Sequence, residues 1–584
     1  MNTRILHILT EYIVLSNIIT IPIAFIEYSI IQKVDQISLI LSLLITILIL
    51  YISPIKSIWG KINIRYTPVK LLIFSITFVF YTSLLLTHLY ITPVYPANPS
   101  GDFLTYSYGS LDIYNGKTDS LFEINDVAIY LIIASLYGLF KDVSNILFIG
   151  RAYILFLNII AFLELYIITL EFYGDYESEI TAILFALLNG FWIITFFATG
   201  LYANTLGLVF TLYLLLYIIR YYKLKEEWML INIGVITLAS VLSHTSSLLL
   251  IGSLLIGGLY TLLITRDYRL LKASLTSITV SIATIVSMPK AYSGILDFIF
   301  KYGFHLKKVS NWAAWSHLKI EVKDPIADSL SMISPFLKEA YKWNGFLGVS
   351  ILLISIILGV YLIKKKENPI YTVLFSWIIL TILTTIFLDD EWRFYPYSGY
   401  ATLILFSYIW RYIKKYYYTH IENLTPDPNI NKTFRYFITF TVITLLIISS
   451  LNIPLYIKSI RSTGLRYYQY TALNTFRWIK INTPNNSVFI SIARWEYMYL
   501  PIYTGRKYLG DVYMYPTELI KYLRNELKIN ITTTSIYVVI WSKVNDKNND
   551  RKMFEHYESD GRFIKIYETN IIKIYRLNIN ELKR

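Results

Sequence analysis

Apolar runs long enough to cross a lipid bilayer recur along this chain from Ile5 to about Pro454. Each run has roughly 18 to 23 residues, and a helix of that length spans the hydrocarbon core of a bilayer. Because lipid offers no hydrogen bonds to the backbone, continuous apolar runs of this kind cross as helices. Of the 584 residues, 55% are hydrophobic and only 16% are charged, which is less charge than a soluble domain carries. The sequence therefore predicts a mostly α-helical, polytopic membrane protein.

Short basic loops between these runs predict the topology. They comprise residues 56–70, 220–225, 266–272, 364–368 and 411–435. The run 127–140 has about 14 residues, too few to cross a bilayer comfortably. If it lies at the membrane surface or re-enters, all of the basic loops fall on one side, as cytoplasmic loops should. We therefore expect about thirteen transmembrane helices, a cytoplasmic N-terminus and a juxtamembrane helix at 127–140.

The charge and the cysteine count narrow the class further. The net charge of +14 is accounted for by the basic loops, so we expect the lipid bilayer and no nucleic acid as a partner. The chain has 0 cysteines, which excludes disulfides and thiolate metal sites within it. The first apolar run lacks a small-residue cleavage site, so we expect it to be retained as a span. These features predict a multi-pass protein of the cell membrane.

The same topology divides the chain into three parts. Residues 1–70 form two additional N-terminal transmembrane helices, residues 71–455 form a transmembrane core, and residues 456–584 form a soluble extracytoplasmic α/β domain. Loops 94–126 and 289–344 of the core then face outside. For the last part the patterns predict helices at 468–482 and 516–529 and strands at 487–492, 534–542, 563–568 and 571–577.

Asp102 is the first acidic residue of a loop that follows directly after a span, and Asp112 and Asp119 follow it. Ser100 is placed as an N-cap, so Asp102 falls in the first turn of a helix. The helix dipole there favours the ionised carboxylate, which can accept a proton from an incoming hydroxyl. The alternative is a second capping residue on a solvated helix, and spacing alone does not decide between the two.

The order of several motifs resembles that of the GT-C glycosyltransferase superfamily. A hydrophobic span is followed by an acidic loop of the form D-x-x-x-Y-…-G, by a short apolar helix, and by a span that opens with Arg151. Three further stretches match in order. They resemble the outer turn and span after the third helix of that core, its short broken pair of spans and its late R-[FY]-x-x-P element, and they are 199–216, 236–255 and 391–405. The resemblance covers roughly residues 70–415 and the C-terminal domain.

The resemblance implies a polyprenyl- or dolichyl-phosphate-linked sugar donor and an essential Asp in the first outer loop, which is Asp102 here. A departing phosphate needs cations, and the guanidinium of Arg393 matches phosphate oxygens through its planar fork. Arg393 can instead pair with the neighbouring acidic residues 389–391. Lys307 and Lys308, beside His305, are further candidates for the donor phosphate, with interfacial snorkelling as the alternative.

Two polar residues interrupt apolar runs. His244 breaks the run 236–255, and polar residues at that depth line a cavity or satisfy one another. We place His244 with the donor-phosphate residues, with a purely structural hydrogen bond as the alternative. Glu164 lies within another span and is expected to meet a neighbouring helix.

The stretch 487–511 resembles the surroundings of the W-W-D-Y-G motif of oligosaccharyltransferase catalytic subunits, which holds the acceptor. The matching residues are 494–498, and three of the five differ from the motif. The resemblance makes Trp495, Glu496 and Tyr497 the acceptor-binding residues, and the alternative is that they pack against the sheet. The metal-binding Asp pattern of that family is incomplete here. A divalent ion is therefore left open, and none is needed if the enzyme resembles protein mannosyltransferases.

Together these features predict a membrane glycosyltransferase that moves a sugar from a lipid-phosphate carrier to a glycan, lipid or protein acceptor at the extracytoplasmic face. An oligosaccharyltransferase-like enzyme is the first alternative. A lipid or solute transporter is the second, although transporters usually show internal repeats and none is evident. A non-catalytic membrane scaffold is the third.

Overall fold

The structure is a computed structural model in which the chain forms two compact units. One unit consists of residues 1–90 and 106–456, and the other consists of residues 91–105 and 457–584. The residues that the structure describes are 3–52, 68–91, 101–118, 120–140, 146–173, 181–185, 202–293, 335–388, 391–417, 465–492, 506–511, 514–525, 535–541, 555–569 and 572–578.

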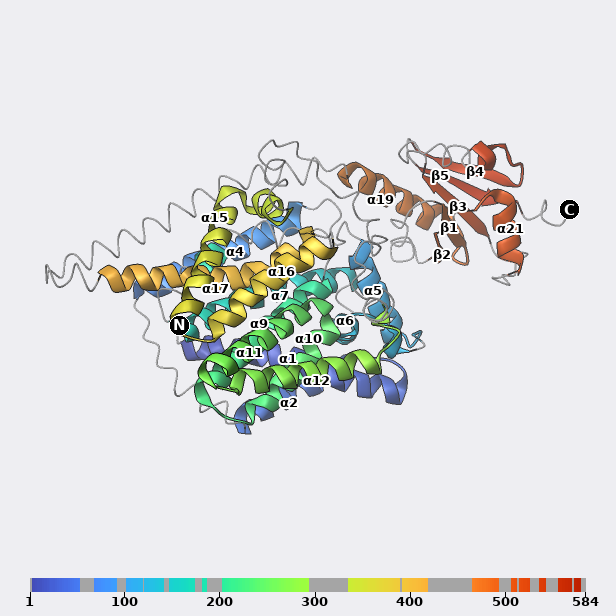
Figure 1. Cartoon of the computed structure of the whole chain (residues 1–584). Helices are drawn as coiled ribbons and strands as arrows, with labels where there is room; N and C mark the ends of the chain where they lie inside the picture. The colour runs from blue at the N-terminus through green and yellow to red at the C-terminus, as the bar shows by residue number, and fades with distance from the viewer. Residues whose placement is uncertain are drawn as a thin grey trace. The chain divides into compact units, whose positions relative to one another are not determined.

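The first unit is a bundle of helices (Figure 1). Its described helices are α1 (Thr3–Ile31), α2 (Gln36–Ile52), α4 (Pro68–Ile91), α5 (Gly101–Tyr114), α6 (Val127–Phe140), α7 (Ile146–Phe172), α9 (Tyr202–Leu224), α10 (Met229–Ser243), α11 (Leu248–Thr265), α12 (Arg269–Ser287), α15 (Pro335–Lys365), α16 (Ile370–Leu388) and α17 (Glu391–Tyr417), with short 3₁₀ turns η1 (Leu121–Glu123) and η2 (Thr245–Ser247).

Six of the described helices are long and apolar enough to cross a membrane. They are Ile5–Ile31, Phe148–Phe172, Ala203–Leu224, Thr245–Thr265, Arg269–Ser287 and Gly348–Lys365. Shorter apolar helices accompany them, at Gln36–Tyr51, Ile73–Ser83, Val127–Phe140, Met229–Ser243 and Ile370–Thr384. The protein is thus mostly helical and suited to span a membrane several times. The expected total of about thirteen spans includes runs in 186–201 and 418–464, which lie outside the described residues.

Two helices form the centre of the bundle and others form its rim. The apolar stretches of α7 and α9 are 89% and 100% buried inside the protein, whereas that of α12 is only 33% buried. Leu263 of α11 and Val286 of α12 are 79% and 64% exposed. In water such exposed apolar faces would be costly, but in a bilayer they contact lipid chains. The rim helices therefore present the surface that faces lipid.

Helix α6 has the bounds that the sequence predicted, residues 127 to 140. Most of its side chains are buried, because α1 and α2 cover it. At Gly138 an added Cβ would lie 2.6 Å from the backbone nitrogen of Gln36, so this glycine permits the close approach of α6 to the α1–α2 turn. The helix is apolar on all sides and protein surrounds most of it, whereas Leu139 and Phe140 at its end are exposed. Its expected position at the membrane surface remains a prediction.

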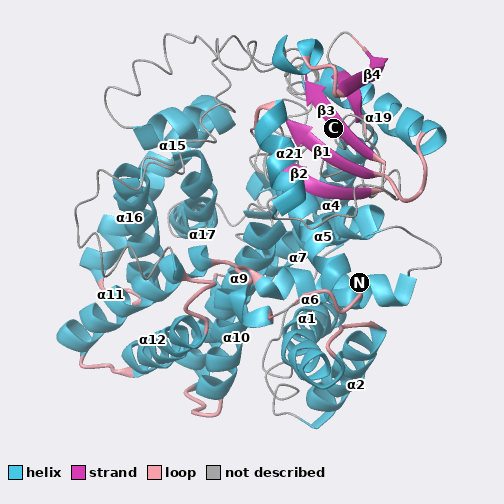
Figure 2. Ribbon diagram, turned by 90° about the vertical axis from the view of Figure 1, so that its right-hand side faces the viewer, coloured by secondary structure: helices cyan, strands magenta, loops and turns pink. Residues whose placement is uncertain are grey.

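The second unit carries a five-stranded mixed sheet with the strand order β2-β1-β3-β5-β4. The strands are β1 (Val488–Ile492), β2 (Lys507–Asp511), β3 (Ile536–Trp541), β4 (Phe563–Glu568) and β5 (Ile572–Leu577), and the helices are α19 (Leu465–Asn482) and α21 (Pro516–Asn525). Strands β2, β1 and β3 are parallel, and β5 and β4 are antiparallel to their neighbours. Figure 2 shows the strands together with these helices.

Alternating apolar residues build the core of this unit. Val538 and Ile540 of β3 share one buried cluster with Leu519 and Leu523 of α21. The period of two along the strand and the spacing of four along the helix bring these side chains to a common face. Four of the five strands lie where the sequence predicted them, and β2 was not predicted.

Candidate functional site

Three parts of the sequence that are far apart meet at one place in the helical unit. They are the first turns of α9, the break between α10 and α11, and the first turns of α17. His244 lies at the break and its ring stacks on the ring of Tyr397 from α17, with centroids 6.3 Å apart and planes 18° apart. Asn204 of α9 donates a hydrogen bond from its amide nitrogen to the hydroxyl of Tyr397. These three side chains join stretches 199–216, 236–255 and 391–405.

His244 ends α10 and begins η2. Its backbone is extended, with φ of −168°, and its side chain accepts a hydrogen bond from the backbone N–H of Ser246 at 3.1 Å. The hydroxyl oxygen of Ser246 lies 2.8 Å from the same ring nitrogen, Nδ1. A nitrogen that accepts a backbone N–H carries no proton, so the neutral ring carries its proton on Nε2. His244 therefore presents an N–H donor beyond the cap that it forms.

A glycine permits the close contact between α9 and the break. An added Cβ at Gly207 would lie 2.7 Å from the Cβ of His244, which real side chains do not tolerate. The hydroxyl of Ser247 donates to the carbonyl oxygen of His244 at 2.9 Å. The backbone polar groups freed by the break are thus partly satisfied locally, as broken helices within a membrane require.

The end of α10 also adjoins the start of α6. The hydroxyl of Tyr292 donates to the carbonyl oxygen of Val241 at 2.9 Å. Burial, and then the nearby carboxylate of Asp126, raise the pKa of Tyr292 above its ordinary value, so this phenol remains a donor. Lys290 pairs with Glu123 of η1 beside it. The acidic segment before α6 is therefore in contact with the segment that follows α12.

Helix α5 begins at Gly101, so Asp102 is its second residue and lies in the first turn, as the sequence predicted. The side chain of Asp102 is outside the described part of the structure. The helix crosses the division between the two units, since residues 91–105 belong to the second. Further along α5, Tyr106 contacts Tyr130 of α6 edge to face with centroids 5.2 Å apart.

Asp112 lies on the same helix but in a different setting. The surrounding protein raises the pKa of Asp112 above its ordinary value, and the charge of Lys117 opposes that rise. Its side chain is exposed. Asp112 is thus a carboxyl group that solvent reaches, which makes it a control for Asp102.

For the remaining predicted site residues, only the position along the chain is known, because their side chains are not described. Arg393 is the third residue of α17, four positions before Tyr397, and its side chain is not described. Lys307 and Lys308 lie outside the described residues, as do Trp495, Glu496 and Tyr497. Trp495 follows the carboxyl end of β1 in the chain, and β1 runs parallel to β3. Ligands of open parallel sheets bind outside this edge.

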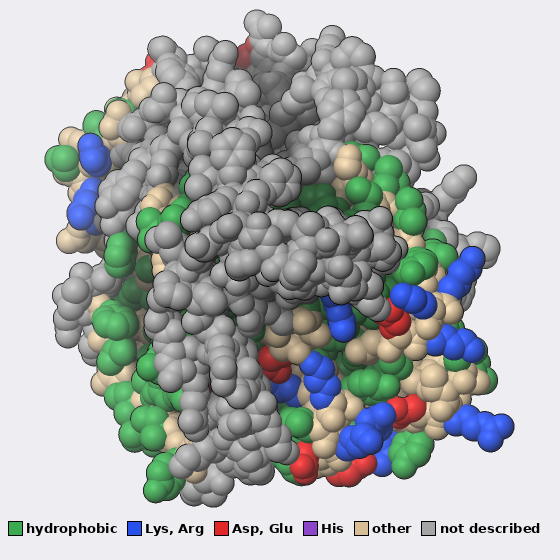
Figure 3. Space-filling model, turned by 90° about the vertical axis from the view of Figure 1, so that its left-hand side faces the viewer, with side chains coloured by type: hydrophobic (Ala, Val, Ile, Leu, Met, Phe, Trp, Pro, Cys, Tyr) green, Lys and Arg blue, Asp and Glu red, His purple; other side chains and the backbone are tan. Residues whose placement is uncertain are grey.

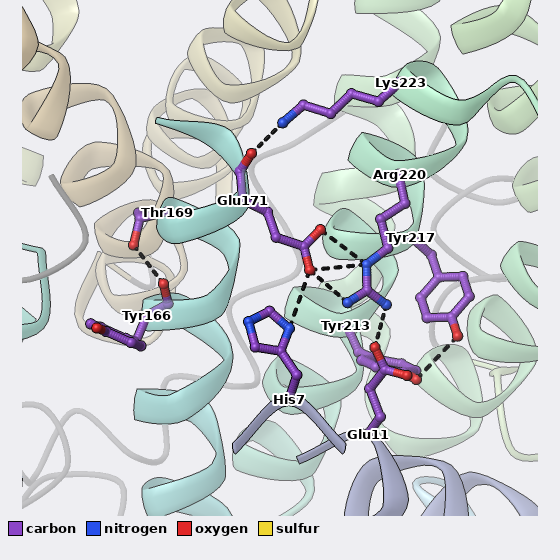
Figure 4. Close-up of polar contacts among 9 residues, drawn as sticks. All are labelled: His7, Glu11, Tyr166, Thr169, Glu171, Tyr213, Tyr217, Arg220 and Lys223. Atoms are coloured by element: carbon purple, nitrogen blue, oxygen red, sulfur yellow. Dashed lines mark hydrogen bonds and ion pairs between the residues drawn. The ribbon is translucent and has the colours of Figure 1, made fainter. Parts of the chain in front are cut away.

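A buried charged network joins α1 to α7 and α9 (Figure 4). The guanidinium of Arg220 binds Glu11 of α1 and Glu171 of α7, with 2.6 Å between its Nη2 and Oε1 of Glu171. His7 Nδ1 lies 3.5 Å from the same carboxylate oxygen. Lys223 donates to the backbone carbonyl oxygen of Glu171. This network was not predicted from the sequence, although ionisable residues inside apolar runs are the signal for one.

Two tyrosines and a carboxyl group add to the polar content of this core. Tyr213 donates to the hydroxyl of Tyr217 at 3.4 Å, and the ring of Tyr217 lies 5.5 Å from the guanidinium carbon of Arg220. Glu164 is fully buried in α7, and its expected contact with a neighbouring helix stays a prediction. Its carboxyl oxygens make no hydrogen bond to any described residue. Among the residues that the structure describes, no three His, Asp or Glu side chains gather as metal ligands would.

Comparisons with known proteins bear on the fold of the chain. No family model and no curated protein sequence matches the chain. The oligosaccharyltransferase AglB from Archaeoglobus fulgidus, solved in complex with an inhibitory peptide and a dolichol-phosphate, matches with a TM-score of 0.52 and 12% identity over 81% of this chain and 69% of its own. ArnT from Cupriavidus metallidurans in the apo state matches with a TM-score of 0.50 and 11% identity over 87% of this chain and 97% of its own. Both are GT-C glycosyltransferases, and at this identity the likeness establishes the architecture: the chain is a membrane protein with the GT-C fold.

Proposed function

We propose that this protein is a membrane glycosyltransferase that transfers a sugar from a polyprenyl- or dolichyl-phosphate carrier to an acceptor at the extracytoplasmic face. The observation that carries the proposal is the meeting of α9, the α10–α11 break and α17 at His244 and Tyr397. These are the stretches whose order resembles the GT-C core, and the chain has that fold. The AglB protein of similar fold binds a dolichol-phosphate and a peptide, which supports a lipid-phosphate carrier for this chain.

The reaction needs one base and a set of cations and hydrogen-bond donors that bind the leaving phosphate. The carboxylate of Asp102 takes the proton of the acceptor hydroxyl, whose oxygen forms a bond to the anomeric carbon of the sugar. The bond between that carbon and the phosphate oxygen breaks, and its electron pair leaves with the lipid phosphate. A single displacement of this kind inverts the anomeric configuration.

The leaving phosphate is bound by cations and N–H donors. Arg393 supplies a bidentate fork, and Lys307 and Lys308 supply point charges. The N–H at Nε2 of His244 supplies a further donor, because its Nδ1 is used for the cap of η2. Tyr397 lies one helical turn after Arg393 and stacks on His244, so α17 and the break hold one phosphate site.

The acceptor is bound by the second unit in this proposal. Trp495, Glu496 and Tyr497 follow β1 in the chain, and β1 runs parallel to β3. If the acceptor is a peptide, the enzyme is oligosaccharyltransferase-like, which is the second candidate function. Because the acceptor lies at the extracytoplasmic face in this proposal, the C-terminal unit that binds it is extracytoplasmic.

Transfer by purified protein tests the proposal. Detergent-solubilised protein is incubated with lipid-linked sugars extracted from the source membranes and with glycan, lipid and peptide acceptors. Mass spectrometry should find a glycosylated acceptor and free lipid phosphate in equal amounts. Detergent removes the two compartments that transport requires, so turnover excludes a transporter. Binding of the lipid-linked sugar without any bond cleavage would contradict the proposal.

A further inference from the structure

At one end, the helical unit carries four cations that form no ion pair with any residue that the structure describes. They are Lys225, Arg266, Lys364 and Lys366, and we refer to them as the basic end. All four are exposed, and within the described residues none forms an ion pair or hydrogen bond through its side chain. Other cations beside them are paired: Lys272 with Glu227, Arg269 with Asp267 and Lys365 with Glu367.

Contacts between helices place these residues at the same end of the bundle. Arg269 at the start of α12 donates to the carbonyl oxygen of Tyr222 near the end of α9, at 2.7 Å. Tyr260 of α11 donates to the carbonyl oxygen of Ile363 near the end of α15, at 3.1 Å. The loops after α9, α11 and α15 therefore share one face. Figure 3 shows Lys and Arg side chains gathered on this face among acidic ones.

Three of the four cations occupy a backbone conformation that normally selects glycine. Lys225, Arg266 and Lys366 have φ of 62°, 56° and 52°. Each directly follows a candidate span, because these spans end at Leu224, Thr265 and Lys365. A left-handed residue after a helix is usually glycine, since a Cβ is strained there. Four candidate spans are followed by such a residue: three of them carry a long cation there, and the span that ends at Ile31 is followed by Gln32.

A helix end alone does not account for this choice. A cation near a helix C-terminus interacts favourably with the dipole, but one in the last turn gains as much without backbone strain. The residue after the helix differs from a residue in the last turn because it lies where the span leaves the hydrocarbon core of the membrane. Aromatic rings flank the same level: the guanidinium of Arg269 lies 4.4 Å from the ring of Tyr222, and Lys272 Nζ lies 5.0 Å from the ring of Tyr268. Such rings mark the headgroup level of a membrane.

We propose that the basic end is a binding site for anionic phospholipid headgroups, built from three cations just outside their spans and from Lys364 in the last turn of α15. Charge complementarity supports this occupant, because exposed cations at headgroup level without an acidic partner in the described part of the chain attract lipid phosphates. The left-handed backbone places Lys225, Arg266 and Lys366 directly after their helices. The site is separate from the transfer reaction and does not depend on its substrates.

The test exploits the strained backbone. Two triple variants remove the same charges: Lys225→Gly, Arg266→Gly and Lys366→Gly, and the corresponding changes to Gln. Glycine relieves the strain and Gln retains it. A third variant, Lys225→Arg with Arg266→Lys and Lys366→Arg, keeps every charge. Purified protein in neutral detergent is titrated with phosphatidylglycerol or phosphatidylcholine, and native mass spectrometry counts the bound lipids.

Wild type should prefer phosphatidylglycerol, and added salt should weaken that preference. Affinity should fall roughly fivefold for each cation removed, in both the Gly and the Gln variant, and should persist in the charge-retaining variant. The unfolding midpoint of the Gly variant should equal or exceed that of wild type, which excludes misfolding as the cause.

Three results would overturn the proposal. One is unchanged phosphatidylglycerol binding by the Gln variant, which would leave these residues a role in the helix ends alone. Another is equal binding of phosphatidylcholine by wild type. The last is displacement of the lipid by inorganic phosphate at equal concentration, which would make the basic end a site for a soluble anion.

Discussion

Asp102 occupies the position on α5 where the helix dipole most favours a negative charge. Asp112, ten residues further along the same helix, has its pKa raised by the protein around it and partly offset by Lys117. The two carboxyl groups therefore have different positions on one helix. In the proposed function the first accepts a proton, whereas the second is exposed near the other end of the helix.

Replacement of Asp102 by Asn distinguishes the two possible roles of this residue, a general base and a helix cap. Asn keeps the size and the capping ability of Asp but cannot accept a proton. We expect Asp102→Asn to express and unfold like wild type and to lose about 10²–10⁴-fold in transfer rate, measured with purified protein. Asp112→Asn is the matched control and should retain most activity. Wild-type transfer by Asp102→Asn would exclude this residue as the base, and rescue by added divalent ions would make it a metal ligand instead.

Substitutions of Arg393 test the proposed phosphate site in the same way. A lysine keeps the charge but loses the planar fork, so Arg393→Lys should lower the transfer rate while the fold persists. His244→Gln should have a smaller effect, because one donor of several is changed. The measurement is the initial rate of release of lipid phosphate. If Arg393→Ala transfers at the wild-type rate, the phosphate is bound elsewhere, and Lys307 and Lys308 become the residues to change next.

At the scale of elements, the network of Arg220 links three helices that are distant in sequence. Buried carboxylates that lose their cation are far more costly than a buried pair replaced as a whole. We expect Arg220→Met to destabilise the protein by about 3–5 kcal/mol, whereas Arg220→Met with Glu11→Gln and Glu171→Gln should recover most of that loss. Thermal unfolding in detergent measures both.

The exposed pair Lys272–Glu227 at the same end of the bundle serves as the control. Solvent screens such pairs, so Lys272→Ala should leave the unfolding midpoint unchanged. Additive losses from the single changes at Glu11, Glu171 and Arg220 would show that these residues do not act as one network.

The local sequence pattern was sufficient to predict some helices and strands but not others. Helix α6 and strands β1, β3, β4 and β5 follow from runs of apolar residues with a clear length or period. Strand β2 has the sequence KYLGD, in which charge and glycine mask any alternation. It is a strand because Val488 and Phe489 of β1 pair with Lys507 and Tyr508, and that pairing is not encoded in five residues.

The candidate site shows the same limit. His244 was identified because it interrupts an apolar run, and its break has the expected location. Its partners Asn204 and Tyr397 were not identified, since both lie in ordinary apolar or aromatic surroundings and only the packing of α9 and α17 brings them together. The Glu11–Arg220 pair spans 209 residues and could not be assigned from either segment alone.

At the scale of the whole molecule, the topology can be tested with single cysteines because the native chain has none. Lys117, Ser293 and Ser559 are exposed and represent the first outer loop, the loop after α12 and the C-terminal unit. Cysteines at these positions should react with an impermeant reagent in intact cells. A cysteine at the exposed Glu226 represents the basic loops and should react only after the membrane is opened. Labelling of Glu226→Cys together with the other three in intact cells would contradict the topology.

The position of Arg220 also determines the order in which this protein can be assembled as it is synthesised. Helix α1 emerges from the ribosome 209 residues before the cation that binds Glu11. At about 5–20 residues per second, that interval is roughly 10–40 s. During it α1 has α2 as its companion, and Thr20 donates to Ser42 across the pair at 2.7 Å. The first hairpin is therefore made before the counter-ion of Glu11, and Glu11 can bind Arg220 only after α9 has been synthesised.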